Sequence, residues 1–131
     1  PCNNTLDPFT ELKQASLLAK VDARDPTAVD AETVFRMATR NGAAAAGFER
    51  VGALREGWKA DVLGIDTDLT RATPLHDPVS HLAFAAHGDD VRFTMVDGEV
   101  LYDESRGGHR TLDGDRIRRE ANAFDVPGVD A

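Results

Sequence analysis

The 131-residue chain has one cysteine, one tryptophan, one tyrosine and no long uninterrupted apolar run. The single thiol, on Cys2, excludes an internal disulfide and a cysteine-rich zinc site. A membrane-spanning helix needs about 20 consecutive apolar residues, and no segment approaches that length. The chain also opens without the basic and apolar pattern of a secretory signal. We therefore expect a cytoplasmic protein with no membrane partner.

The charge is one-sided, because 23 Asp and Glu residues face 15 Lys and Arg residues, for a net charge of −8. A negative electrostatic field repels the phosphate backbone of nucleic acid, so we expect no nucleic-acid partner. Asp outnumbers Glu by 16 to 7, and Arg outnumbers Lys by 12 to 3. Abundant short carboxylates and scarce lysine are typical of a halophilic protein, whose self-repulsion is screened at high salt. An ordinary acidic protein is the alternative interpretation.

The length fits one domain, and apolar residues at helical spacing predict four helices. Three of them have an aspartate at the cap position, and two of these have proline directly after it, where the missing N–H costs nothing. The third should end at Gly88, with His87 in its last turn. Asn41-Gly42 should interrupt the second helix. The predicted helices cover residues 8–21, 31–40 with a short continuation at 43–46, 78–87 and about 113–124.

Two segments predict three strands. Residues 61–66 form a short apolar run bounded by aspartates, and residues 91–103 alternate around Asp97-Gly98. Asp-Gly is a strong hairpin signal, because the two-residue turn needs positive φ at both positions. Val91, Phe93 and Met95 should share one buried face. Three strands make a thin sheet whose edges need covering.

Taken alone, the reactive side chains assemble no catalytic or metal site. The four histidines are spaced unlike metal ligands, and we expect His81 to be packed and hydrogen-bonded. A small histidine metal protein is the weakest of the alternatives. Cys2 has no histidine near it in sequence, and the pairs at 66/68 and 89/90 are interpreted as solvated loop acids.

Five segments together resemble one enzyme family. Residues 52–66, GALREGWKADVLGID, resemble a G-x-[LI]-x-x-G-x-x-A-D pattern of amidohydrolases. Residues 36–47 resemble its MAT-x-NGA helix, residues 73–82 its DPVSHL segment, and residues 91–98 its VDG strand. Residues 3–9 resemble the SNN-x-LD-x-F opening after the last barrel strand. The combination is similar to methylthioadenosine/S-adenosylhomocysteine deaminases and to triazine chlorohydrolases of the N-ethylammeline type.

The resemblance implies an α/β fragment. It would contain the last helices of a (β/α)8 barrel, then the C-terminal strands of a small composite β-domain and a terminal helix. Residues 1–48 would belong to the barrel. Residues 49–125 would form the β-domain portion with an inserted helix at 77–87, and residues 126–131 a tail.

The resemblance also implies a function for a longer parent protein. The parent would use a divalent metal, usually zinc, to deaminate or dechlorinate a nitrogen heterocycle. Because the family's metal ligands would precede residue 1, we expect this chain to hold no metal and to be inactive alone. Its partners would be the N-terminal part of its own chain, the small heterocycle and another copy in a homo-oligomer. The alternative is a stand-alone, non-catalytic interaction module that pairs its open sheet edges with another chain.

Asn3 and Asn4 are the candidate substrate-binding residues, on the loop at the barrel's active face. The alternative is a turn in which the two side chains bond the backbone. Cys2 stands where the family usually has serine, which leaves the substrate open.

Overall fold

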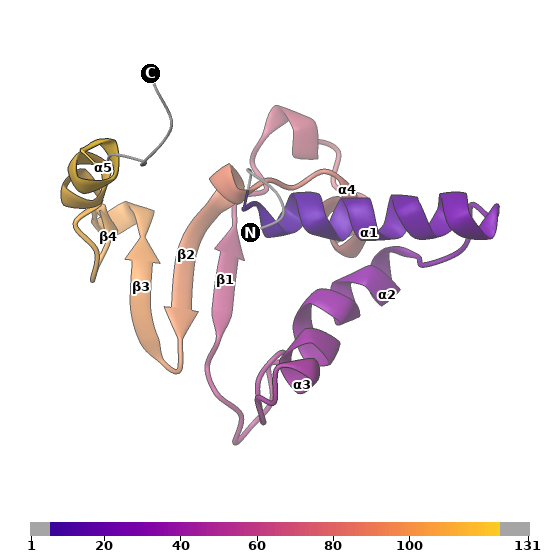
Figure 1. The fold of residues 1–131 in the computed structure, drawn as a ribbon, viewed down its shortest axis with the longest axis horizontal. Helices are drawn as coiled ribbons and strands as arrows, with labels where there is room; N and C mark the ends of the chain where they lie inside the picture. Colours follow the sequence, from indigo (N-terminus) through magenta and orange to yellow (C-terminus); the bar gives the residue numbers. More distant parts are fainter. Residues whose placement is uncertain (1–5, 124–131) are drawn as a thin grey trace, which may run out of the picture.

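The computed structural model describes residues 6–123, and it separates a helical part from a sheet (Figure 1). The strands form one antiparallel sheet in the order β1-β2-β3-β4. None of the helices within these residues is long and apolar enough to cross a membrane. The elements are α1 Pro8–Ala23, α2 Ala31–Arg36, α3 Gly42–Ala45, β1 Val62–Ile65, α4 Pro78–Phe84, β2 Val91–Val96, β3 Glu99–Asp103, β4 Gly108–His109 and α5 Gly114–Asn122.

All four predicted helix starts are confirmed. At each one an aspartate carboxylate accepts a hydrogen bond of 2.9–3.0 Å from an amide two or three residues later, which satisfies one of the helix's free N–H groups. The capping residues are Asp7, Asp30, Asp77 and Asp113. Local side-chain chemistry therefore determines where these helices begin.

One predicted interruption and one predicted helix end are wrong. The chain does not break at Asn41-Gly42, because both residues keep helical dihedrals and a π-helical turn, Met37–Asn41, leads directly into α3. The third helix ends at Phe84, earlier than predicted, and Gly88 opens a 3-10 turn, Gly88–Asp90. His87 therefore lies outside the helix. Its amide donates to the Asp90 carboxylate at 2.9 Å, and this bond holds the chain in the turn.

The hairpin is confirmed, with Asp97 at φ 50° and Gly98 at φ 83° between β2 and β3. The short strand β4, which pairs with β3, was not predicted, because two residues carry no readable alternation. The expected burial of one β2 face is met only in part, since every residue from 91 to 95 is half-buried. The apolar face expected on the last helix includes Phe124, which lies outside the described residues.

The core lies among the helices, with α1, α2 and α4 packed together. Ser16 is fully buried at the edge of this core, and its hydroxyl donates to the Val29 carbonyl at 2.6 Å. Ile65 and Val91 bring the edge of the sheet against the core. The buried apolar residues of this core are Phe9, Leu12, Val34, Ala83 and Ala86.

The π-helical turn has a direct packing partner in the loop that follows α3. Gly52 adopts φ +80°, and a Cβ added there would lie 2.8 Å from the Arg40 nitrogen and 2.9 Å from the Arg40 Cα. Both contacts are with backbone, so no side chain can rotate away. Glycine at position 52 therefore lets the loop lie directly against the helix.

We predict that Gly52→Ala lowers the free energy of unfolding by about 2 kcal/mol or more, because it adds a backbone clash to the left-handed φ penalty. Gly57 is a matched control, since it adopts φ +76° with nothing within 4 Å of an added Cβ. Gly57→Ala should cost only about 1–2 kcal/mol. Urea unfolding midpoints of the two variants measure the difference, and equal losses would show that the close approach is unimportant.

Candidate functional site

The predicted substrate-binding residues, Asn3 and Asn4, lie outside the described residues, as does Cys2. Within residues 6–123, no three His, Cys, Asp or Glu side chains lie together as a metal site requires. Among the described residues, two groups of polar contacts lie at the end of the sheet that faces α4. Each of these groups joins segments far apart in sequence.

His81 differs from its prediction. It is buried in α4, with only 9% of its surface exposed, as expected for a packed histidine. Its Nε2 atom, however, has no hydrogen-bond partner, so the expected hydrogen bonding is wrong for that atom. His81 lines a shallow pocket of about 250 Å³ between α4 and the preceding loop, together with Arg71 and His76.

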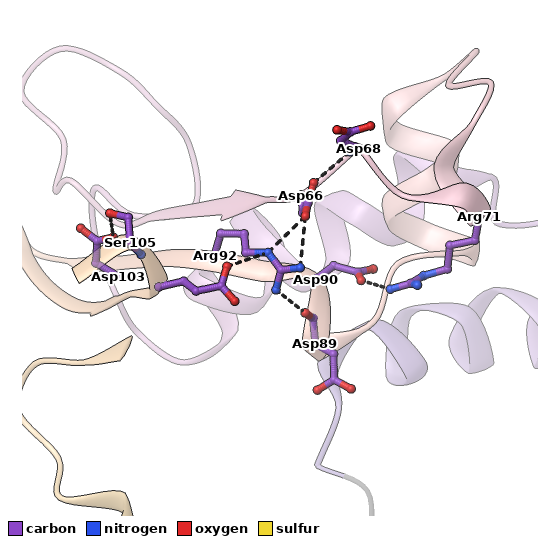
Figure 2. Close-up of polar contacts among 9 residues, drawn as sticks. Asp66, Asp68, Arg71, Asp89, Asp90, Arg92, Asp103 and Ser105 are labelled. Atoms are coloured by element: carbon purple, nitrogen blue, oxygen red, sulfur yellow. Dashed lines mark hydrogen bonds and ion pairs between the residues drawn. The ribbon is translucent and has the colours of Figure 1, made fainter. Parts of the chain in front are cut away.

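The first polar group surrounds Asp90, which was interpreted as a solvated loop acid and is instead 1% exposed. Its carboxylate accepts hydrogen bonds from the Arg71 guanidinium and the His87 amide. Its carbonyl accepts from the Asp66 amide at 2.8 Å. Figure 2 shows Arg71 reaching Asp90 from a separate segment. The spacing of 19 residues between Arg71 and Asp90 carries no signal in the sequence, which is why this pair was missed.

The second group surrounds Arg92 on β2 (Figure 2). Its guanidinium lies 3.1 Å from Asp66 at the end of β1 and 2.9 Å from Glu104 in the turn after β3. It also donates to the Asp89 carbonyl at 3.0 Å. One side chain therefore connects three segments at this end of the sheet.

Asp66 is held as an anion. The hydrogen bond from the Asp68 amide lowers the pKa of the Asp66 carboxyl most, and Arg92 lowers it further, against a raising effect of burial. A lowered pKa favours the folded state at neutral pH, and this contribution is lost as acid protonates the carboxyl. Asp66 is thus a paired structural anion, unlike a general base, which needs a pKa near the working pH.

An open hollow of about 820 Å³ lies beside β2 and β3, and its lining is mainly apolar. Tyr102 and His109 meet there edge to face, with ring centroids 5.2 Å apart. Arg92 and Glu104 line it too, but each is already engaged in their shared ion pair. The hollow offers apolar contact area, and two of its charged groups, Arg92 and Glu104, are paired with each other.

We predict that Arg71→Ala lowers the free energy of unfolding by about 3 kcal/mol, because it leaves the Asp90 carboxylate buried without its cation. Asp90→Asn should largely suppress this loss in the double variant, since the neutral amide needs no cation. Arg118, in an exposed ion pair with Asp115, is the matched control, and Arg118→Ala should cost less than about 1 kcal/mol. Urea unfolding of the four variants measures this. Equal losses for the two arginines would contradict the role assigned to Asp90.

The chain is similar in sequence to two named deaminases. It is 54% identical over 99 residues to the 5-methylthioadenosine/S-adenosylhomocysteine deaminase of Haloarcula marismortui, over 76% of this chain and 23% of that protein. It is 46% identical over 119 residues to the 5'-deoxyadenosine deaminase of Methanosarcina acetivorans, over 91% of this chain and 27% of that protein. The chain thus spans about a quarter of the length of the curated relatives it matches.

Two solved structures resemble the fold. A zinc-bound adenosine deaminase from Xanthomonas campestris matches 88% of this chain and 26% of its own, at a TM-score of 0.83 and 33% identity. The zinc complex of an atrazine chlorohydrolase from Arthrobacter aurescens matches 86% of this chain and 25% of its own, at a TM-score of 0.72 and 29% identity. The model of the amidohydrolase family matches residues 1–101. This match covers well over half of the sequence, and the chain therefore belongs to the amidohydrolase family.

Proposed function

We propose that this chain is the C-terminal part of a longer amidohydrolase that removes an amino group from an adenosine-type heterocycle by hydrolysis. The observation that carries the proposal is the 54% identity to a deaminase of methylthioadenosine and S-adenosylhomocysteine. The 5'-deoxyadenosine deaminase relatives act on the same class of compound, as their names state. Residues 1–48 and 49–125 are proposed to belong to the barrel and to the composite β-domain, respectively.

A triazine chlorohydrolase is the second candidate, and a specific likeness favours it. Triazine hydrolases share the fold with TM-scores up to 0.76. Their sequence identity is 29%, against 33% for the solved adenosine deaminase and 44–54% for the deaminases found by sequence. We therefore place deamination of an adenosine derivative first.

The metal is proposed to be held outside the described residues. Both solved neighbours named above contain zinc, so the parent protein is expected to use a divalent metal. Residues 6–123 do not offer a fitting ligand set, and no metal-dependent step is derived from them. This part of the chain would instead support the enzyme structurally, while Asn3 and Asn4 remain the predicted substrate-facing residues.

We predict that the full-length protein from the native gene releases ammonia from methylthioadenosine, S-adenosylhomocysteine or 5'-deoxyadenosine. Removal of the metal with a chelator should abolish this activity, and added zinc should restore it. The 131-residue chain alone should show none. Ammonia and chloride release measured side by side distinguish the two candidates.

The intact mass of the protein made from the native gene should be measured alongside the activity. A mass about three times that of this chain is expected, because 99 of its residues match 23% of the deaminase relative. A native product of 131 residues would overturn the proposal and favour the stand-alone interaction module. Faster chloride release from a chlorotriazine than ammonia release would favour the triazine hydrolase.

We also propose that the protein is cytoplasmic. Its net charge and its aspartate excess support the further proposal that it is adapted to high salt. Its relatives include proteins of Haloarcula marismortui and Halobacterium salinarum, at 54% and 50% identity. Relatives from Thermococcus species are 48–50% identical, so similarity alone does not select a salt-loving source. The charge composition is what carries this part of the proposal.

We predict that the melting temperature of the full-length protein rises between about 0.1 M and about 2 M KCl, as salt screens repulsion among carboxylates. The control variant carries Asp22→Lys and Asp89→Lys at two exposed positions, and these changes shift the net charge of this chain from −8 to about −4. Its melting temperature should respond less to KCl. Equal salt responses in the two proteins would contradict a role for surface charge.

A further inference from the structure

The dipeptide Asn41-Gly42 lies where the π-helical turn runs into α3. An asparagine followed by glycine is chemically labile, because glycine has no side chain to shield its own backbone nitrogen from the preceding side-chain amide. Asn41 is exposed to solvent, so burial does not protect its amide. A reactive pair therefore lies on the surface of a helical segment.

The reaction open to this pair is deamidation. The Gly42 backbone nitrogen loses its proton and attacks the Asn41 Cγ, so that a new C–N bond forms and the side-chain nitrogen leaves as ammonia. The product is a five-membered succinimide ring. Water, the one co-reactant, then opens either carbonyl of this ring and yields aspartate or isoaspartate at position 41.

Two features of the backbone oppose ring closure. The Gly42 N–H donates a hydrogen bond to the Thr39 carbonyl, so the attacking nitrogen is held within the helical segment. Asn41 has φ −72° and ψ −39°, and the succinimide ring requires this ψ to rotate well away from its helical value. The turn must therefore open before Asn41 reacts.

The packing of the turn also requires glycine at position 42. A Cβ added there would lie 2.9 Å from the Met37 carbonyl oxygen, which is a backbone atom five residues earlier. On the outside of the turn, Gly52 lies against the Arg40 backbone and keeps the turn closed. The same close packing thus demands the labile dipeptide and holds it in an unreactive conformation.

Opening of this turn does not require the core to unfold. Neither the π-helical turn, Met37–Asn41, nor α3 contains a buried residue. Local opening therefore exposes little apolar surface and costs less free energy than global unfolding.

We propose that Asn41 is a gated deamidation site, which is protected while the π-helical turn is closed and is modified when that turn opens locally. Isoaspartate adds a methylene to the backbone, so the helical hydrogen bonds cannot re-form around it. Each modification is therefore a permanent record that the turn has opened. The proposal is independent of the proposed function, because it uses contacts within the described residues alone.

The full-length protein, incubated in mildly alkaline buffer with and without urea, tests the proposal. Cleavage after glutamate releases residues 33–49, and mass spectrometry of this peptide measures the conversion of Asn41. Conversion should be at least about tenfold slower in the folded than in the urea-unfolded protein. Below the unfolding transition, the rate should hardly change with urea, because local opening exposes little surface.

Two results of this experiment would overturn the proposal. Equal conversion rates in folded and unfolded protein would show that the turn does not protect Asn41. A rate that rises steeply in low urea would show that the whole domain must unfold before Asn41 reacts, so that the turn is not the gate.

A matched pair of variants tests the closing contact. Gly52→Ala should raise the conversion rate at least about threefold, because the added Cβ presses on the Arg40 backbone and favours the open turn. Gly57→Ala, which meets no atom within 4 Å, should leave the rate close to that of the unaltered protein. Equal rates in the two variants would contradict the role assigned to Gly52.

Hydrogen exchange provides a second measurement on the unaltered protein if Gly52→Ala does not fold. The Gly42 amide should be slowed in exchange by the same factor as Asn41 is slowed in deamidation, within about threefold, because one opening exposes both. An exchange rate slowed far more than deamidation would overturn the proposal, since Asn41 would then react without opening of the turn.

Discussion

The buried carboxylate of Asp90 is the constraint on which the connection between the helices and the sheet depends. A charge with 1% of its surface exposed is costly unless it is paired and hydrogen-bonded. Arg71 supplies the cation, and the His87 amide supplies a second hydrogen bond. Meeting this requirement fixes the loop before α4 relative to the turn after it. The backbone carbonyl of Asp90 accepts from the Asp66 amide and so connects the end of β1 to the same turn.

Arg92 adds polar contacts between β2 and the elements on both sides of it. It links Asp66 with Glu104, so that the end of β1 and the turn after β3 are tied to the same strand. The sheet itself contributes little buried surface, since the core lies mainly among α1, α2 and α4. Polar contacts at one end of the sheet therefore do what a second apolar layer does in thicker domains.

The features predicted well from sequence are those with local causes. Aspartate caps, proline at the first helical position and an Asp-Gly turn each act over two or three residues, and the corresponding helix starts and hairpin are confirmed. The features missed depend on partners far away in sequence. Asp90 was taken for a solvated acid because Arg71 is 19 residues distant. The π-helical turn was predicted as a break in the helix. The sequence around Asn41 gives no sign that Gly52, from a later loop, packs against this turn.

The same distinction explains why the sequence was sufficient to predict the family but not the catalytic residues. Three of the described residues that carry the resemblance have structural roles. Gly52 allows the close approach to Arg40, and Asp77 caps α4. Asp61 accepts the Asp97 amide at 2.7 Å and so anchors the hairpin turn to the segment before β1. Motifs of this kind report a shared fold, and an activity has to be argued from the groups that touch the substrate. The residues predicted to make such contact, Asn3 and Asn4, lie outside the described residues, so the deaminase assignment depends on the relatives and on experiments with the full-length protein.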